Sequence, residues 1–290
     1  MDAATFLVQC LNAVQYGLLL FLVASGLTLI FGIMGVINLA HGSFYMMGAY
    51  MAFVLAPYFG DWFITKLVVG TLLAAAFGYV LEWAFFSFLY QREHLQQVLM
   101  TYALILVFEE LRSLLVGNDV HGVQAPEWLA GGFQLGELMS YPWYRVFASV
   151  ACVAVALALY FVVNRTRLGM MIRAGASNRD MARGLGIDIR WLYRVVFAGG
   201  VALAALAGMI AAPLSSVYPD MGGSVLIICF VVVVIGGIGS ISGALIASML
   251  VGIVDTFGKV FFAEYSGVGV YLLMAVVLVW RPEGLMKRAY

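Results

Sequence analysis

The chain has 290 residues, of which 64% are hydrophobic and only 10% are charged, and its formal net charge is zero. With a mean hydropathy of +1.02, this composition excludes a water-soluble domain and predicts a polytopic membrane protein. The neutral balance gives no reason to expect a nucleic acid as partner. Runs such as VLIICFVVVVI (225–235) do not alternate apolar and polar residues, so they predict membrane helices rather than a β-barrel.

The apolar runs predict an all-α membrane protein with eight to nine spans, some short or broken, in a single domain over residues 1–290. A helix needs about 20 apolar residues to cross the bilayer. The seventh candidate is shorter than that, so it is expected to be a half-helix or a re-entrant segment. The candidates lie near 6–31, 37–58, 62–90, 96–116, 143–163, 195–217, 224–238, 243–263 and 265–281.

Lysine and arginine predict the orientation, because cytoplasmic loops carry an excess of both. Most of these residues lie in three places along the chain. If the chain has nine spans, all three places lie on the same side of the membrane. We therefore expect a cytoplasmic C-terminus and an N-terminus outside. The loop at 117–142 then also lies outside, and it carries Asp119, Glu127 and Glu137 but no lysine or arginine. The basic places are a turn with Arg92, the segment 164–194 with Arg165, Arg167, Arg173, Arg179, Arg183, Arg190 and Arg194, and the C-terminus with Arg281, Lys287 and Arg288.

The stretch GIMGVINLAHG (32–42) is unusual for a membrane helix, because glycine, asparagine and histidine interrupt an apolar region. It forms part of a weak internal repeat, because residues 32–48 and 236–252 have a similar glycine spacing. Unwound backbone survives at membrane depth only inside protein or beside a water-filled cavity. Two interpretations stay open, namely breaks that line or gate a solute pathway, or small residues that pack helices tightly. The residues concerned are Gly32, Gly35, Asn38, His41, Gly42, Gly236, Gly239, Ser240 and Ser242.

Asp255 is the acidic residue predicted deepest in the membrane, and Lys259 is placed to pair with it on one helix face. An ion-gradient-driven secondary transporter would need such a residue, so that class is the alternative function. The run GIVDTFGKV (252–260) is not an ATP site, because its glycine spacing is wrong and Val260 follows the lysine. We expect no enzymatic activity, cofactor or metal site in this chain.

The segment 164–194 is the only substantial hydrophilic stretch on the predicted cytoplasmic side. Its middle, residues 170–184, predicts one short helix that Gly184 and Gly186 terminate. One interpretation is a basic loop that sets the topology and contacts anionic lipid. The other is a lever that docks on a cytoplasmic partner.

Two stretches carry a resemblance to a known family. GLTLIFGIMGVINLAHGSFYMMGAY (26–50) and RAGASNRDMARGLGI (173–187) closely resemble signatures of the LivH-type permease subunits of branched-chain amino-acid ABC importers. The run GGIGSISGALIASMLVG (236–252) and the ending RPEGLMKR (281–288) fit the same family. The resemblance implies a multi-pass permease of the bacterial inner membrane for branched-chain or related amino acids. Similar permeases carry urea, short amides or aromatic acids, and Ser43 stands where family members often have an acidic residue, so the solute itself stays open.

The same resemblance implies partners. These are a LivM-like permease or a second copy of the chain, two cytoplasmic ATPase subunits that hold ATP and Mg²⁺, and a periplasmic solute-binding protein. It also implies that 173–187 is the coupling loop, which docks on the ATPase. Family-like positions within it are Ala174, Asn178, Ala182 and Gly184, and the polar contacts to the ATPase would come from Arg173, Arg179, Asp180 and Arg183.

Overall fold

The computed structural model describes residues 3–90, 92–134 and 140–286. Glu137, Lys287 and Arg288, which contributed to the predicted orientation, lie outside these residues. The first half of the described chain contains α1 (Ala3–Met34), α2 (His41–Val54), α3 (Ala56–Phe59), α4 (Phe63–Ala84), the 3-10 helix η1 (Phe86–Phe88), α5 (His94–Val116) and the 3-10 helix η2 (Glu127–Leu129). The second half contains the strands β1 (Gly132–Gln134) and β2 (Ser140–Pro142), then α6 (Trp143–Arg165), α7 (Arg167–Ser177), α8 (Arg179–Gly184), α9 (Ile189–Ala211), α10 (Met221–Gly236), α11 (Ile241–Phe261), η3 (Ala263–Tyr265) and α12 (Ser266–Trp280).

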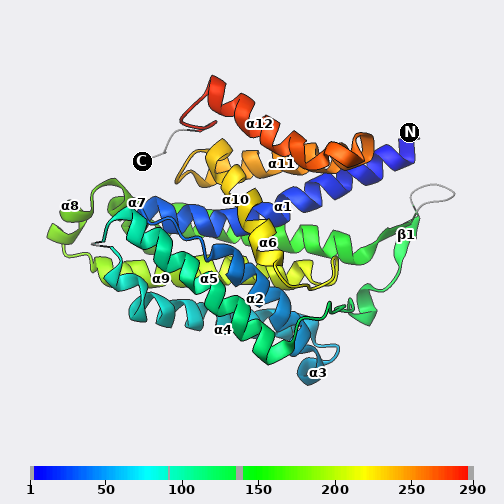
Figure 1. Ribbon diagram of the computed structural model, residues 1–290, viewed down its shortest axis with the longest axis horizontal. Coiled ribbons are helices and arrows are strands. Elements are labelled where there is room, and N and C mark those ends of the chain that lie inside the picture. Colours follow the sequence, from blue (N-terminus) through cyan, green and yellow to red (C-terminus); the bar gives the residue numbers. More distant parts are fainter. Residues whose placement is uncertain (1–2, 91, 135–139, 287–290) are drawn as a thin grey trace.

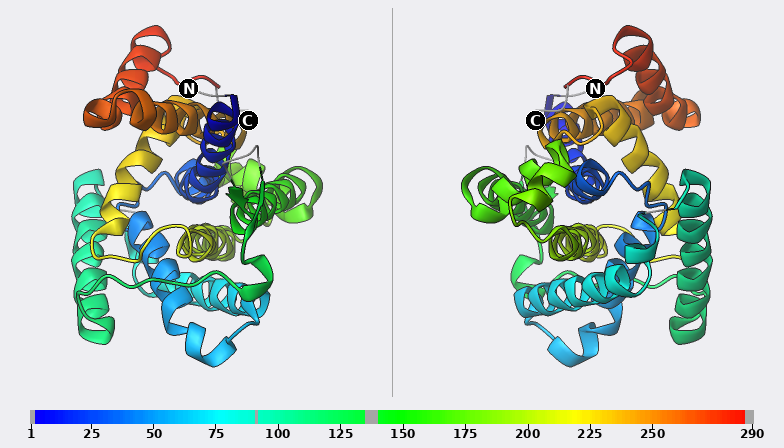
Figure 2. Two further views of the ribbon diagram at one scale, coloured as in Figure 1. Left: turned by 90° about the vertical axis from the view of Figure 1, so that its right-hand side faces the viewer. Right: turned by 90° about the vertical axis from the view of Figure 1, so that its left-hand side faces the viewer.

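The long helices form a bundle around α1 and α9. In the views along the bundle, these two helices lie in the middle and the other long helices surround them (Figure 2). α1 packs against α9, α11, α6 and α10, while α9 also packs against α4 and α2. In the most apolar 18-residue segment of α1, 94% of the residues are buried within the protein, whereas the same share in α6 is 17%. α1 is therefore a core helix, whereas α6 presents most of its apolar surface outward.

Five helices of the described chain are long and apolar enough to cross a membrane, and their ranges are Ala3–Met34, Phe63–Phe88, Trp143–Arg165, Ile189–Ala211 and Ile241–Phe261. Two shorter apolar helices lie at Met221–Gly236 and Gly267–Trp280. The predicted multi-pass helical membrane protein is thus confirmed in its coarse form. The seventh predicted span corresponds to α10, which has 16 residues.

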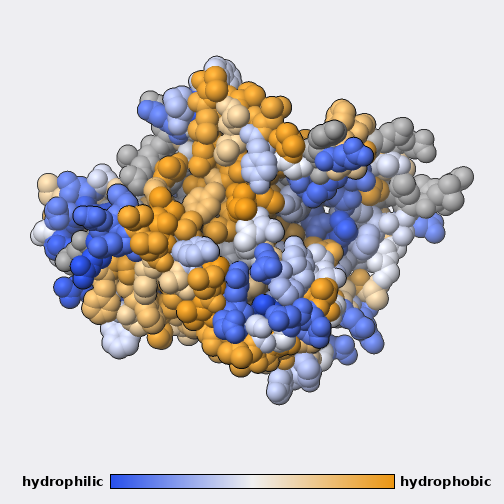
Figure 3. Space-filling view, viewed as in Figure 1, coloured by the Kyte–Doolittle hydropathy of each residue, from blue (hydrophilic) through white to orange (hydrophobic). Residues whose placement is uncertain are grey.

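The surface of the bundle changes in composition along its length. The start of α1 and strand β1 lie at one end, and α7 and α8 lie at the other (Figure 1). Hydrophilic residues gather around α7 and α8 and in the opposite half, and a broad hydrophobic region lies between them (Figure 3). The loop at 117–142 also contains a feature that the sequence did not predict, because β1 and β2 pair as a small antiparallel sheet with Phe133 opposite Tyr141.

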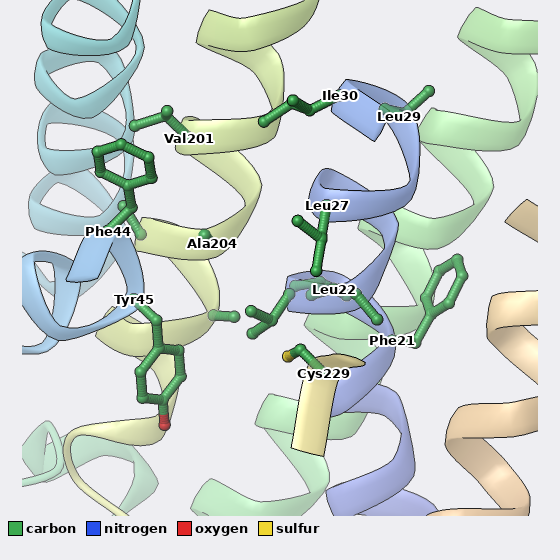
Figure 4. Packing of buried hydrophobic residues seen from close by; sticks show 14 of the residues in the cluster. Phe21, Leu22, Leu27, Leu29, Ile30, Phe44, Tyr45, Val201, Ala204 and Cys229 are labelled. Atoms are coloured by element: carbon green, nitrogen blue, oxygen red, sulfur yellow. The ribbon is translucent and has the colours of Figure 1, made fainter. Parts of the chain in front are cut away.

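Small residues let the central helices approach one another closely. Gly48 of α2 lies against α9, where a Cβ atom at Gly48 would be 2.5 Å from the Cα atom of Ala205. Such contacts between backbones are the usual way in which membrane helices associate. Around them, Leu22 and Leu27 of α1 are buried together with Phe44 of α2, in the cluster shown in Figure 4.

The structure moves several predicted boundaries. The second span was predicted at 37–58, but α2 begins only at His41 because residues 35–40 are not helical. The sixth was predicted at 195–217, but α9 begins at Ile189.

The prediction of one helix over 170–184 was wrong, since α7 and α8 are separate helices. Asn178 between them has an extended backbone (φ −150°, ψ 107°), and its side-chain oxygen accepts a hydrogen bond from the Met181 amide at 2.9 Å. Asparagine competes with the helical backbone in this way, which ends one helix and starts the next.

Candidate functional site

The first glycine-containing stretch forms a real helix break. α1 ends at Met34, Gly35 takes a left-handed conformation (φ +68°), and α2 starts at His41. The Nε2 atom of His41 lies 3.0 Å from the carbonyl oxygen of Val23. Val23 precedes the end of α1 by about 16 Å at the helical rise of 1.5 Å per residue. Residues 35–40 therefore run back along α1, and α2 begins beside the middle of that helix.

Asn38 and His41 are both completely buried in this subunit. The Oδ1 atom of Asn38 accepts a hydrogen bond from the Ala40 amide at 3.1 Å, so it stabilises the turn that precedes α2. The Nδ2 atom of Asn38, the Nδ1 atom of His41 and the Oγ1 atom of Thr28 are buried without a hydrogen-bond partner among the described residues. Buried polar groups normally have hydrogen-bond partners. The break therefore holds three polar atoms whose presence its own hydrogen bonds do not explain.

The second stretch forms a tighter break between α10 and α11. Gly237 (φ +97°) and Gly239 (φ +83°) supply the left-handed backbone of this turn, which other residues adopt only with strain. Ser240 caps α11, because its Oγ atom accepts a hydrogen bond from the Gly243 amide at 3.1 Å. Ser242 lies alongside, with its Oγ atom 3.5 Å from that of Ser240. Gly236 is buried against Gly243 across the turn.

The fold brings parts of the two breaks together. A Cβ atom at Gly32 would lie 3.2 Å from the Cα atom of Gly239, so the end of α1 contacts the α10–α11 turn directly. Gly42 is not part of this contact. It packs instead against Gly222 at the start of α10, where a Cβ atom at Gly222 would lie 2.8 Å from the Gly42 carbonyl oxygen.

The predicted coupling residues fall into two groups. Arg173 and Ala174 are partly buried, and the Arg173 guanidinium donates a hydrogen bond to the Val163 carbonyl at the end of α6. Ala182 is buried. The exposed group consists of Asn178, Arg179, Asp180, Arg183 and Gly184.

One exposed arginine connects the coupling segment to the first break. A Cβ atom at Gly35 would lie 2.9 Å from an Nη2 atom of Arg179, so the guanidinium covers the glycine that ends α1. The same guanidinium lies 5.9 Å from the ring centroid of Tyr193, within the range of a cation–π contact. The first turn of α8 therefore touches both the break and α9.

The sequence reasoning missed two apolar side chains at the same place. Met181 is 63% exposed and Leu185 is 76% exposed, and they follow one another at a spacing of four residues. Large apolar side chains exposed beside charged residues are typical of protein-binding surfaces. The spacing of Met181 and Leu185 can be read from the sequence. Their exposure cannot, because it depends on how α8 is oriented relative to the rest of the protein.

The predicted pair of Asp255 and Lys259 is confirmed. The Nζ atom of Lys259 lies 2.5 Å from Oδ2 of Asp255, and the two side chains are 60% and 10% exposed, respectively. Lys259 also lies 5.4 Å from the ring centroid of Tyr16 in α1. Asp255 is therefore a neutralised carboxylate at the α1–α11 contact.

A second ion pair lies at the end of the bundle that holds α8. Glu82 of α4 is buried, 3.5 Å from the Arg194 guanidinium, and its Oε1 atom accepts a hydrogen bond of 2.5 Å from the Tyr90 hydroxyl. Burial, and then the Glu82 carboxylate, raise the pKa of Tyr90, which keeps the hydroxyl a donor. Among the described residues, no three His, Cys, Asp or Glu side chains are grouped so that they could hold a metal ion.

Comparison with known proteins adds the family. A family model described as "branched-chain amino acid transport system / permease component" matches residues 9–278. The high-affinity branched-chain amino acid transport system permease protein BraD of Pseudomonas aeruginosa is 29% identical, over 98% of this chain and 96% of BraD. The corresponding protein LivH of Escherichia coli is 28% identical, over 98% of this chain and 96% of LivH. LivM of Escherichia coli is 27% identical, over 90% of this chain and 66% of LivM.

The range matched by the family model, residues 9–278, includes both helix breaks and the coupling segment of this chain. Because the family model covers residues 9–278, the chain belongs to the family of permease components of branched-chain amino acid transport systems.

Proposed function

We propose that this chain is one of two permease subunits of an ATP-driven importer for branched-chain or related amino acids in the bacterial inner membrane. The names of its relatives support the solute class. LivH and LivM of one organism both match this chain, which supports a LivM-like partner, and a second copy of this chain is the other option. Two ATPase subunits would hold ATP and Mg²⁺, and a periplasmic binding protein would deliver the solute.

The proposed topology has nine membrane segments, namely α1, α2, α4, α5, α6, α9, α10, α11 and α12. The N-terminus and the sheet of β1 and β2 face the periplasm, and α7 and α8 face the cytoplasm. The concentration of arginine in 164–194 and its absence from 117–142 support this orientation.

The contact between Arg179 and Gly35 supports the proposed mechanism best. α8 would dock on an ATPase through Arg179, Asp180 and Arg183, with Met181 and Leu185 as apolar contacts. A displacement of α8 would reach the first break directly through Arg179. The contact of Gly32 with Gly239 would transmit this displacement to the second break. The helices around both breaks would then switch access to a solute path between this subunit and its partner.

The experiment purifies the complex through a tag on this chain and reconstitutes it in proteoliposomes that contain ATP. We expect ATP-dependent uptake of radiolabelled leucine in the presence of the binding protein. Arg183→Glu is expected to abolish uptake without removing the permease from the membrane. Arg167→Glu is the matched control, because Arg167 is exposed on the same segment but lies outside α8. Gradient-driven leucine uptake by this chain alone would instead identify a secondary transporter.

A further inference from the structure

A cleft of about 1390 Å³ opens at the end of the bundle that holds α8. One wall consists of the end of α4, η1 and the turn toward α5, and the other consists of α8 and the start of α9. The ion pair of Glu82 with Arg194 lies where the two walls meet. The lining therefore joins a predicted membrane span to the hydrophilic segment beyond it.

The cleft carries an excess of positive charge. Five arginines line it, together with the carboxylates of Glu82, Asp180 and Asp188. Glu82 is engaged with Arg194 and Tyr90. Asp188 caps α9, because its Oδ1 atom accepts hydrogen bonds from the amides of Arg190 and Trp191. Apart from the pair of Glu82 and Arg194, the two carboxylates of Asp180 and Asp188 face four arginines, which are Arg92, Arg179, Arg183 and Arg190.

Such a set of guanidinium groups suits a phosphate. Arginine offers planar pairs of donors that match phosphate oxygens, and it stays charged at every physiological pH. Arg92, Arg183 and Arg190 are exposed, and they take no part in the ion pairs of Glu82 with Arg194 and of Asp255 with Lys259.

The cleft continues into an apolar surface on α4. Trp83 and Phe88, which line the cleft, are 59% and 70% exposed. On the same face of α4, at helical spacing from Trp83, Val80 is 56% exposed and Leu72 is 64% exposed. α4 belongs to a candidate membrane span, so this stripe is suited to contact acyl chains. Exposed aromatic residues beside charged ones are also typical of the membrane–water boundary.

We infer that this cleft binds the phosphate headgroup of an anionic phospholipid, with the acyl chains along the Leu72–Val80–Trp83 face of α4. A phosphate with a hydrocarbon chain attached matches both halves of this surface, the arginines of the cleft and the apolar face of α4. Basic pockets between helices at the cytoplasmic boundary are suited to such headgroups. The bound lipid would bridge α4 to α8 and α9, and so brace the segment that carries Arg179. Only the naming of the leaflet as cytoplasmic rests on the proposed function.

The test uses the full-length chain in nanodiscs of phosphatidylcholine with one quarter phosphatidylglycerol, followed by native mass spectrometry of the retained lipid. The wild type is expected to retain phosphatidylglycerol in preference to phosphatidylcholine. The double variant Arg92→Gln/Arg190→Gln is expected to bind phosphatidylglycerol about 25-fold more weakly, since each arginine near an anionic surface contributes roughly a fivefold factor. Both residues lie outside the coupling set, so the outcome is independent of transport.

Two further variants and a competition experiment test whether the retained lipid is bound in the cleft. Arg165→Gln/Arg167→Gln removes the same charge at the same end of the bundle but outside the cleft, and it is expected to keep the preference. Arg92→Lys/Arg190→Lys is expected to retain most of it, which shows that the site still folds. Soluble glycerol phosphate should compete poorly if the apolar stripe contributes. Equal retention of both lipids by the wild type, equal loss in the control, or full competition by glycerol phosphate would overturn the lipid site.

Discussion

The Nε2 atom of His41 lies 3.0 Å from the carbonyl oxygen of Val23, and this contact sets the starting point of α2 beside the middle of α1. The two helices can meet there because Gly26 leaves room for the imidazole. A Cβ atom at Gly26 would lie 3.1 Å from the Cε1 atom of His41. The short α2 and the returning segment 35–40 follow from this arrangement, which the sequence signals only as a break.

Two adjacent glycines of α10 provide a test of the close approach between α10 and α2. A Cβ atom at Gly222 would lie 2.8 Å from the Gly42 carbonyl oxygen, whereas one at Gly223 would meet nothing within 4 Å. We expect Gly222→Ala to destabilise the protein by about 1–3 kcal/mol, because overpacking forces the backbones apart. Gly223→Ala should be neutral or stabilising by up to about 1 kcal/mol, from helix propensity. Thermal unfolding in detergent measures both, and equal effects would contradict the packing described for Gly42.

Replacing Asn38 separates a structural role from a role in the solute path. Asn38→Ala removes the acceptor for the Ala40 amide and leaves a buried donor unsatisfied, at a cost of about 1–3 kcal/mol. We expect a lower melting temperature and less assembled complex, with partial recovery in Asn38→Ser, which restores an acceptor. An unchanged melting temperature together with lost leucine uptake would instead place Asn38 on the solute path.

The unequal exposure of Asp255 and Lys259 predicts unequal effects of removing each. Lys259→Met leaves a carboxylate that is only 10% exposed without its cation, and we expect a loss of about 2–3 kcal/mol. Asp255→Asn leaves a lysine that is 60% exposed and lies two residues before the end of α11, where a long side chain can reach water, so its effect should be the smaller of the two. The double variant Asp255→Asn/Lys259→Met should resemble Asp255→Asn in thermal unfolding.

Uptake by the Asp255→Asn variant also tests the alternative transporter class. An amide cannot carry a coupling proton or sodium ion as a carboxylate does, so a gradient-driven transporter that uses Asp255 would stop. We expect near-normal ATP-dependent uptake, because Asp255 is already neutralised by Lys259. Complete loss of uptake with normal assembly would favour the ion-coupled mechanism.

The exposed Met181 predicts an apolar contribution to the coupling contact. Met181→Glu should leave the free energy of unfolding of the isolated chain within about 0.5 kcal/mol of the wild type, as expected for an exposed side chain. It should reduce the amount of ATPase that copurifies with the chain, whereas Met181→Leu should not. Retention of the ATPase by Met181→Glu would restrict the contact to the charged residues of α8.

The sequence predicted the features that depend on local chemistry. Apolar runs marked the membrane helices because lipid excludes unpaired backbone groups. Glycine spacing located both breaks, and the i, i+4 spacing of Asp255 and Lys259 predicted their ion pair. The family resemblance named the coupling segment. Asn178 was part of that segment, but its capping of α8 was not recognised, so two helices were predicted as one.

The amino-acid sequence by itself determined that this is a helical membrane protein of a permease family, and where its helices break. Only the tertiary structure decided that Gly32 meets Gly239, that Arg179 covers Gly35 and that His41 is buried against Val23. Local propensity carries no information about such pairs. Such pairs form where small residues on two helices allow the backbones to approach. Which helices meet in this way depends on the packing of the whole bundle.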